Sequence, residues 1–256
     1  MNLGRGAHPP LIFHDNTVEK SVYDTWEPTY MRRFPEVFAP VHEIIDKRVT
    51  EPDARPPYYR FIMPRFESAV SEDVYMGLLA GAQRLQTLWA VNSNETIPYW
   101  RERLLTHLKQ QIETHQLYVD VYTLAHVIEQ LPNPISPGCC IHGDATLANL
   151  LWERPTNKWW WIDPLRRPFI PNDPHVDLGK MFQSCFEYEA VLTHVTNRPA
   201  FNHDVARRLA EKTHLSYAAG RLWLYIHLVR LLPYQVLRVR KIYEHVLARW
   251  PWWATV

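Results

Sequence analysis

The stretch that decides how this sequence is interpreted runs Ile141-His142-Gly143-Asp144-Ala145-Thr146-Leu147-Ala148-Asn149-Leu150-Leu151-Trp152. Its apolar residues surround two polar side chains, Asp144 and Asn149, which lie five positions apart. Placing a carboxylate and an amide in such surroundings costs free energy unless each has a partner. The pattern favours a chemical site, and the alternative is a simple turn in which Asp144 caps a helix.

A second apolar run, Trp159-Trp160-Trp161-Ile162, ends in another acidic residue, Asp163. Asn157-Lys158 between the two runs is typical of a hairpin turn. A hairpin here returns Asp163 to the side of Asn149. Their oxygens then suit Mg²⁺, a hard cation that takes few protein ligands together with phosphate oxygens. Asp144, at the start of the same loop, can accept the proton of an incoming hydroxyl.

Phosphoryl transfer needs a metal that bridges the phosphates, a base that orients the nucleophile and a cation on the phosphates. The pattern His-Gly-Asp-x-x-x-x-Asn, then a hairpin, then Ile-Asp resembles the aminoglycoside phosphotransferase and choline kinase family, a branch of the protein-kinase-like fold. The residues that carry this resemblance are His142, Gly143, Asp144, Asn149, Ile162 and Asp163. It implies ATP as co-substrate, Mg²⁺ as cofactor and a hydroxyl-bearing small molecule as acceptor.

The resemblance also implies roles for individual residues. It implies a catalytic group, whose members are Asp144, His142, Asn149 and Asp163. Two of them, Asn149 and Asp163, would hold the metal. The family often continues with Asp-Pro-x-x-Asp-Leu, and Asp173-Pro174-His175-Val176-Asp177-Leu178 follows here. Asp177 would then be structural and would brace the catalytic loop.

Hydrophobic periodicity predicts an α+β fold. The strand candidates are residues 11–13, 17–22 and 58–63, and the later helical segments are residues 174–195 and 203–248. From about residue 72 apolar residues recur at helical spacing, and strands return over residues 139–163. The resemblance then implies a bilobal, protein-kinase-like chain for this order of strands and helices. Residues 1–68 would form a reduced, strand-rich nucleotide lobe with the hinge. Residues 69–256 would form a mainly helical lobe that carries the catalytic-loop hairpin and the acceptor pocket.

The first lobe offers candidates for nucleotide binding. Gly4 and Gly6 resemble a short glycine-rich loop, whose backbone N–H groups can approach phosphates closely. Lys20 falls where the family's phosphate-contacting lysine would lie. That lysine normally pairs with a glutamate on the following helix, and Glu27 and Glu36 are both candidates. The alternative for Lys20 is a solvated lysine on an edge strand.

A third nucleotide element is Phe61-Ile62-Met63-Pro64-Arg65-Phe66. It resembles the segment that joins the two lobes in the family, whose backbone near Met63 would hydrogen-bond the adenine edge. A buried strand that ends at a proline is equally compatible with these residues.

The last segment indicates the kind of acceptor. Residues 201–256 hold nine lysines and arginines against three acidic residues. An aminoglycoside is a polycation and favours an acidic pocket, so this excess favours a sugar, a sugar phosphate or a nucleotide-like acceptor. Arg230, on an apolar helix candidate, is a candidate for the acceptor pocket. Most of the other basic residues fit solvated helix faces. They are not interleaved with aromatic residues, which argues against a nucleic-acid partner.

Composition narrows the class and the compartment. The 256 residues are 46% hydrophobic and 21% charged, which excludes collagen-like and disordered chains. No apolar run is long enough to cross a bilayer, so no membrane partner is expected. The N-terminus has no apolar signal core, and the three cysteines show no disulfide or zinc spacing. These features predict a cytoplasmic enzyme.

Two alternatives to a small-molecule kinase stay open. One is a non-catalytic kinase-like module that binds a nucleotide or a partner. The other is an atypical protein kinase, against which the absence of the Ala-Pro-Glu segment of protein kinases counts.

Overall fold

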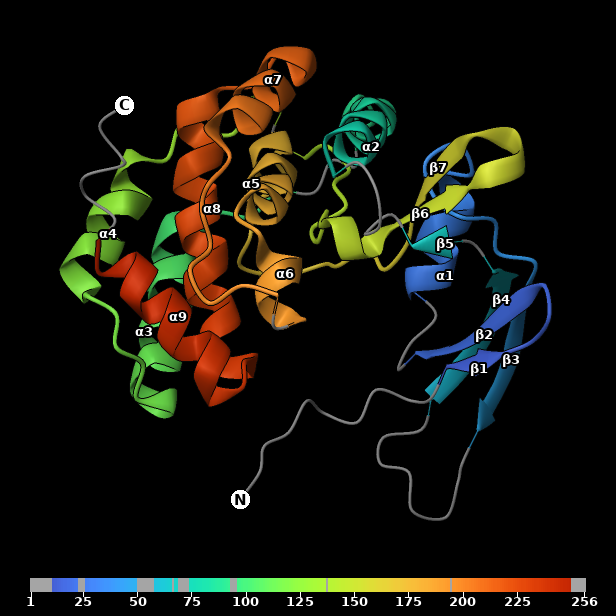
Figure 1. The fold of residues 1–256 in the computed structure, drawn as a ribbon, viewed down its shortest axis with the longest axis horizontal. Coiled ribbons are helices and arrows are strands. Elements are labelled where there is room, and N and C mark those ends of the chain that lie inside the picture. Colours follow the sequence, from blue (N-terminus) through green and yellow to red (C-terminus); the bar gives the residue numbers. More distant parts are fainter. Residues whose placement is uncertain are drawn as a thin grey trace.

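The computed structural model describes residues 11–22, 26–49, 58–65, 67–68, 74–92, 96–136, 138–193 and 195–249. Gly4 and Gly6 lie outside the described residues. Figure 1 shows a strand-rich part on one side of the molecule and a larger helical part on the other. The predicted α+β class, with a small strand-rich part before a mostly helical one, is confirmed. The boundary between residues 68 and 69 stays a prediction.

The first sheet is antiparallel and has the strand order β1-β2-β4-β3. Its strands are β1 (Ile12–Phe13), β2 (Thr17–Val22), β3 (Glu43–Val49) and β4 (Tyr58–Pro64). Helix α1 (Trp26–Arg33) follows β2 and buries Pro28 and Met31. Strands β1, β2 and β4 match the predicted segments. Strand β3 was not predicted, because Asp46-Lys47-Arg48 interrupts the alternation of apolar and polar residues.

The catalytic-loop hairpin belongs to a second, three-stranded antiparallel sheet. Its strands are β5 (Glu67–Ser68), β6 (Leu150–Glu153) and β7 (Lys158–Trp161). The turn is longer than the predicted pair of residues, because Arg154–Thr156 form a 3₁₀ turn and Asn157 then takes a left-handed φ of 52°. The hairpin returns the chain as expected, since the N–H of Ile162 donates to the carbonyl of Asn149 at 3.0 Å.

Trp161 fixes this hairpin to the rest of the molecule. The indole is fully buried and its N–H donates to the carbonyl of Gly81 at 2.9 Å. Its backbone donates to Val37 at 3.1 Å and accepts from Ala39 at 2.9 Å. A Cβ on Gly81 would lie 2.6 Å from the Trp161 ring, so only glycine permits this approach. One tryptophan thereby locks the hairpin between the first lobe and the helices.

Eight helices are described in the rest of the chain. They are α2 (Val74–Trp89), α3 (Trp100–His115), α4 (Val121–Gln130), α5 (Pro174–Cys185), α6 (Tyr188–Leu192), α7 (His203–Thr213), α8 (Tyr217–Leu231) and α9 (Leu237–Leu247). The two long predicted helical segments are both broken. Glu187 takes a left-handed φ of 53° after α5, and Ser216 caps the start of α8 by accepting from Ala219 N–H. Within the described ranges, no helix is both long and apolar enough to span a membrane.

Helix α5 lies at the centre of the helical part, with α2, α7 and α8 packed around it (Figure 1). Every residue of α5 is buried. Two glycines allow α5 and α8 to approach closely: a Cβ on Gly179 would lie 2.4 Å from Cβ of Trp223, and one on Gly220 would lie 2.7 Å from the Phe182 ring. The close approach holds Lys180, next to Gly179, near α8.

Candidate active site

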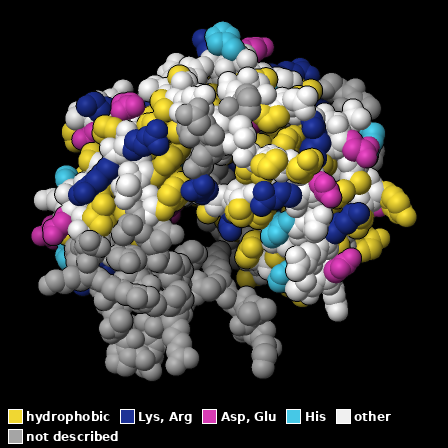
Figure 2. All heavy atoms as spheres, turned by 180° about the vertical axis from the view of Figure 1, so that it is seen from behind, with side chains coloured by type: hydrophobic (Ala, Val, Ile, Leu, Met, Phe, Trp, Pro, Cys, Tyr) yellow, Lys and Arg dark blue, Asp and Glu magenta, His cyan; other side chains and the backbone are white. Residues whose placement is uncertain are grey.

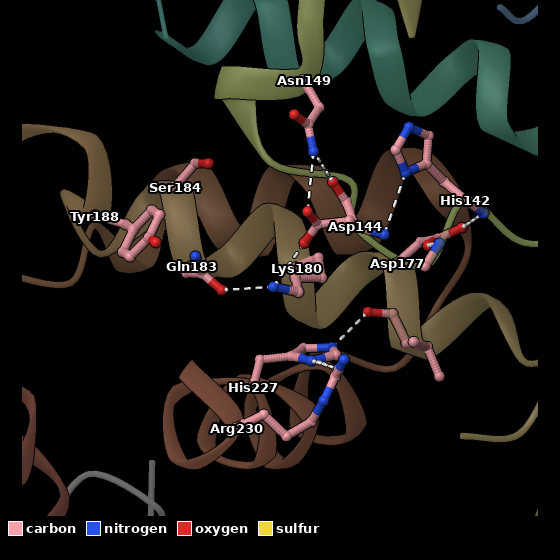
Figure 3. A network of polar contacts seen from close by, with 12 residues as sticks. His142, Asp144, Asn149, Asp177, Lys180, Gln183, Ser184, Tyr188, His227 and Arg230 are labelled. Atoms are coloured by element: carbon pink, nitrogen blue, oxygen red, sulfur yellow. Dashed lines mark hydrogen bonds and ion pairs between the residues drawn. The ribbon is translucent and has the colours of Figure 1, made fainter. Parts of the chain in front are cut away.

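The predicted base and its neighbours form a hydrogen-bonded group (Figure 3). One carboxylate oxygen of Asp144 lies 2.8 Å from Nζ of Lys180, and the other accepts from Nδ2 of Asn149 at 3.1 Å. Nδ2 of Asn149 also donates to the backbone carbonyl of Asp144 at 2.8 Å. Because the amide nitrogen faces Asp144, the amide oxygen of Asn149 is the atom that remains for a cation.

Asp144 combines an ionised carboxylate with access from outside. Enclosure by the protein raises the pKa of this carboxyl, but the adjacent Lys180 ammonium outweighs that effect, and the pKa ends below its usual range. The side chain is still 32% exposed, whereas that of Lys180 is only 4% exposed. A molecule from solvent can therefore reach the carboxylate, while the lysine holds it from the protein side.

His142 is fully buried and ties two parts of the loop together. Its Nε2–H donates to the carbonyl of Ile162 at 2.9 Å, so Nδ1 is the acceptor for the N–H of Asp144 at 3.2 Å. Burial lowers the pKa of His142 to about 4, although the nearby Asp144 acts in the opposite direction. The imidazole is therefore neutral at neutral pH, and it positions the backbone of Asp144.

Asp177 of α5 holds the backbone of the loop at His142 and Gly143. Its carboxylate accepts from the backbone N–H of His142 at 2.9 Å, from that of Gly143 at 2.7 Å and from the indole of Trp89 at 2.9 Å. Burial raises the pKa of Asp177 to about 6, with the three donors working against the rise. Gly143 has a φ of 80°, and a Cβ there would lie 1.9 Å from the carbonyl oxygen of Leu165. This position requires glycine.

The second half of the site joins the two lobes. Nζ of Lys20, on β2, lies 2.5 Å from Asp163 and 2.6 Å from Glu27. Of the two glutamates that the sequence left open, Glu27 on α1 is therefore the one that contacts Lys20, and Glu36 is exposed. Burial lowers the pKa of Lys20, but the two carboxylates outweigh it and the net shift is upward. Lys20 is charged at any physiological pH.

Asp163 takes a left-handed φ of 59°, a conformation that residues other than glycine adopt uncommonly and Asp more readily than most. Its side chain is 41% exposed, so it faces both Lys20 and the outside. Among the residues that the structure describes, no group of three or more His, Cys, Asp and Glu could hold a metal. The amide oxygen of Asn149 and the carboxylate of Asp163 are hard oxygen donors, which is the ligand type that Mg²⁺ takes.

Comparison with known proteins was made by sequence and by structure. No protein-family model and no curated protein matches the chain by sequence. A solved glucosamine kinase matches 93% of this chain and 73% of its own at a TM-score of 0.55 and 10% identity. The choline kinase LicA from Streptococcus pneumoniae matches 92% of this chain and 81% of its own at a TM-score of 0.55 and 12% identity. A thermostable mutant of the aminoglycoside phosphotransferase APH(4)-Ia matches 93% and 88%, at a TM-score of 0.54 and 12% identity.

This chain has the fold of the aminoglycoside phosphotransferases and choline kinases. The fold that the motif predicted is therefore confirmed. In this kinase-like fold, Met63 lies in β4 opposite Val18 and its side chain is only 5% exposed. Beyond Pro64 the chain passes from the first sheet to β5 of the second. Met63 thus lies near the end of β4, and its place beside an adenine stays a prediction.

Three further residues lie near this group, and the sequence pattern did not single out two of them, Lys180 and His227. Lys180 contacts Asp144, and His227 on α8 is fully buried and bonds Arg230, the candidate for the acceptor pocket. A usable signal existed for Lys180. It lies between Gly179 and Met181 in a mostly apolar helical segment, and a lysine that is buried there needs an anionic partner.

A cavity of about 90 Å³ lies next to the loop, between α1 and the segment after Asp163. Tyr30, Arg33, Gly143, Leu165 and Arg167 are among its lining residues. Neither Lys20 nor Asp144 lines it. The cavity is therefore separate from the groups around Lys20 and Asp144.

Proposed function

We propose that this protein is an Mg²⁺- and ATP-dependent phosphotransferase that transfers the γ-phosphoryl group of ATP to a hydroxyl group of a small molecule. Three contacts carry this proposal: Lys20 with Asp163, Asp144 with Asn149, and Asp144 with Lys180. These residues come from distant parts of the sequence and supply a cation, oxygen ligands and a base within one site. Phosphoryl transfer needs these parts and little else from a protein.

Asp144 is the proposed base. The attacking hydroxyl oxygen forms a bond to the γ-phosphorus, the bond between that phosphorus and the β,γ-bridging oxygen breaks, and ADP leaves. The hydroxyl proton passes to the carboxylate of Asp144. The ion pair with Lys180 keeps this carboxylate ionised and oriented before the acceptor arrives. His142, neutral and buried, holds the backbone of Asp144 in place.

Lys20 is the proposed phosphate contact, and Glu27 holds its ammonium in position. Asn149 and Asp163 are the proposed ligands of the metal, through the amide oxygen and the carboxylate. Mg²⁺ bound there with the nucleotide would supply positive charge that neutralises the phosphate oxygens. Met63 is proposed to lie beside the adenine, and Gly4 and Gly6 stay predictions for the phosphate loop.

The acceptor is proposed to be a sugar, a sugar phosphate or a nucleotide-like molecule rather than an aminoglycoside. The similar solved structures are, by their names, kinases of glucosamine and choline and an aminoglycoside phosphotransferase. These names support a small-molecule hydroxyl compound as the acceptor. Lys180 contacts Asp144 and Arg230 lies on the adjacent helix α8, and these basic residues would repel a polycation.

Two substitutions test the proposal. Asp144→Ala should lower kcat about 10²- to 10⁴-fold and leave ATP binding measurable, because it removes the base and keeps the metal ligands. Asp163→Ala should instead weaken the Mg²⁺-dependent part of ATP binding. Turnover of labelled ATP with a library of hydroxyl compounds, and titration of ATP with and without Mg²⁺, measure the two effects.

Asp204→Asn, an exposed carboxylate at the start of α7, is the matched control and should behave as the wild type. If both active-site variants phosphorylate as the wild type does, the proposal is wrong. If the wild type binds Mg-ATP and shows no turnover that depends on Asp144, the chain is a binding module.

A further inference from the structure

The cavity next to the catalytic loop is enclosed by segments that lie apart in the sequence. Helix α1 forms one wall, and Gly143 of the loop contributes to another. The remaining lining residues come from the segments 139–141 and 165–172. Its volume is about 90 Å³, whereas one water molecule needs only about 10–15 Å³ by the same measure. The cavity can therefore hold a molecule several times larger than water.

Three guanidinium groups line this cavity. Arg33 on α1 and Arg166 are exposed, and Arg167 is half-buried. Among the described residues that line the cavity, none is acidic. Because three positive groups and no described negative one surround the same space, its electrostatic potential favours an anion.

Arg167 carries a hydrogen-bond donor that the described part of the protein leaves unused. Its Nε is buried and has no hydrogen-bond partner among the described residues. A buried donor without a partner costs free energy, which an acceptor from a bound molecule would recover. Phosphate oxygens are suitable acceptors, because a guanidinium group presents a planar fork of donors to them.

Much of the remaining lining is aromatic or apolar. Trp26 and Tyr30 of α1 stack on each other, with ring centroids 4.8 Å apart. The hydroxyl of Tyr30 already donates to the carbonyl of Ile141 at 2.9 Å. Ile141, Leu165 and Ile170 add aliphatic surface. A molecule that has an apolar body and one anionic group matches this lining better than a free inorganic ion does.

The walls of the cavity adjoin both halves of the candidate active site. Trp26 directly precedes Glu27, the partner of Lys20, and Gly143 directly precedes Asp144. A molecule that contacts α1 and the loop together favours the arrangement in which Glu27 holds Lys20. By linkage, such a molecule and a nucleotide bound at Lys20 strengthen the binding of each other.

We propose that this cavity is a regulatory site for a small organic phosphate, whose phosphate group is bound by Arg33 and Arg167 and whose apolar body lies against Trp26 and Tyr30. Several guanidinium groups suit the double negative charge of a phosphate monoester. Occupation of the cavity raises the affinity for the nucleotide. The anion site rests on the cavity alone, whereas its effect on the nucleotide rests on the proposed function.

The first experiment titrates phenyl phosphate into the protein by calorimetry, with and without a non-hydrolysable ATP analogue and Mg²⁺. Phenyl phosphate should bind at least about 10-fold more tightly than phenol or inorganic phosphate. Arg167→Gln and Arg33→Gln should each weaken its binding about 10-fold. Arg33 is exposed, so its variant should fold even if Arg167→Gln does not. Arg103→Gln, which removes an exposed arginine of α3, is the matched control and should bind as the wild type does.

Several results of this titration contradict the anion site. The wild type may not fail to bind phenyl phosphate at millimolar concentration, and phenol or inorganic phosphate may not bind as tightly. Wild-type affinity in both Arg33→Gln and Arg167→Gln also overturns the proposal. Displacement of phenyl phosphate by the ATP analogue does the same, because it would place the anion in the nucleotide site.

The second experiment measures the Kd of the ATP analogue with Mg²⁺, at zero and at saturating phenyl phosphate. This Kd should fall about 5-fold or more in the wild type and should not change in Arg167→Gln. An unchanged or higher Kd in the wild type overturns the regulatory role. If the wild type binds phenyl phosphate through the two arginines but binds no nucleotide, the anion site stands and the proposed phosphotransferase function fails.

Discussion

Lys20 joins three segments that lie far apart in the sequence: strand β2, helix α1 through Glu27, and the end of the hairpin through Asp163. The lysine and Glu27 are largely buried, with side chains 15% and 14% exposed. An enclosed ammonium between two carboxylates leaves one net negative charge in the group. That charge suits a site that takes up a metal ion together with a polyphosphate.

A single residue, His142, makes the free energy of unfolding depend on pH. Its folded pKa of about 4 is below the unfolded value of 6.5, so between these values the unfolded chain binds more protons. Stability contributed by this group is fully present above pH 6.5 and is lost as the pH falls towards 4. The shift corresponds to about 3 kcal/mol across that window, as an order of magnitude.

His142→Gln should therefore flatten the fall in the free energy of unfolding between pH 6.5 and pH 4, measured by urea titration at a series of pH values. His227 contributes in the same direction and Asp177 in the opposite one, so the difference between wild type and variant is the quantity to read. His126→Gln, at an exposed site on α4, should leave the slope unchanged. A variant with the wild-type slope contradicts the assignment.

Much of the polar group around Asp144 follows from residue types and spacing alone. Asp144, Asn149 and Asp163 could be named because polar residues in apolar runs need a reason to be there. The choice between Glu27 and Glu36 as the partner of Lys20 could not be predicted, since it depends on how α1 packs against the sheet. Lys180 was missed because its partner lies far away in the sequence, and only the three-dimensional arrangement of α5 and the loop brings them together.

At the scale of elements, periodicity located most helices and misjudged where long helical segments break. The break between α7 and α8 depends on the Ser216 cap, and the one after α5 depends on a left-handed Glu187. Both are local choices of backbone conformation that hydrophobic spacing does not register. The close packing of α5 and α8 could not be predicted from the sequence either. A glycine in a helix indicates a close approach only when the helix opposite it is known.

Gly179→Ala tests the α5–α8 contact. The added methyl group would lie 2.4 Å from Cβ of Trp223 and 2.9 Å from its backbone carbon, neither of which can rotate away. The helices must move apart, at a cost of about 1–3 kcal/mol in the free energy of unfolding. Because Lys180 is the next residue, kcat should fall as well. Thermal unfolding and steady-state kinetics measure the two effects.

Gly77→Ala is the matched control, since its added methyl would meet side-chain atoms alone, at 3.2 Å from the half-buried Trp159 ring and 3.4 Å from Leu147. It should cost clearly less stability and leave kcat near the wild-type value. Equal losses of stability and of kcat in the two variants would show that the close α5–α8 contact does not require glycine at position 179.

For the whole molecule, the two lobes are connected at a few defined points. Trp161 links the segment at Val37 and Ala39 to the hairpin and to α2, and Lys20 links β2 to Asp163. A nucleotide bound across these points would contact both lobes. On the face drawn in Figure 2, basic side chains are interspersed with acidic and apolar ones, so that face offers no continuous basic area for a nucleic acid.

A non-hydrolysable ATP analogue with Mg²⁺ should therefore stabilise the whole chain. At a ligand concentration of about 100 times Kd, the free energy of unfolding should rise by about 2.7 kcal/mol. EDTA should remove most of this gain, and Lys20→Met should need a much higher analogue concentration to reach it. Thermal unfolding at several analogue concentrations gives the measurement. A gain that is insensitive to both changes would mean that the nucleotide binds elsewhere.

Helix α5 has no face in contact with solvent, and it also carries Asp177 and Lys180. Most helices can accumulate neutral substitutions on an outer surface, but this one has none to offer. Each of its side chains is constrained, either by packing against a neighbour or by contact with the loop that carries Asp144. The sequence of such a segment should change more slowly than the sequences of the exposed helices around it. A search for distant relatives of this chain should therefore compare these twelve positions first.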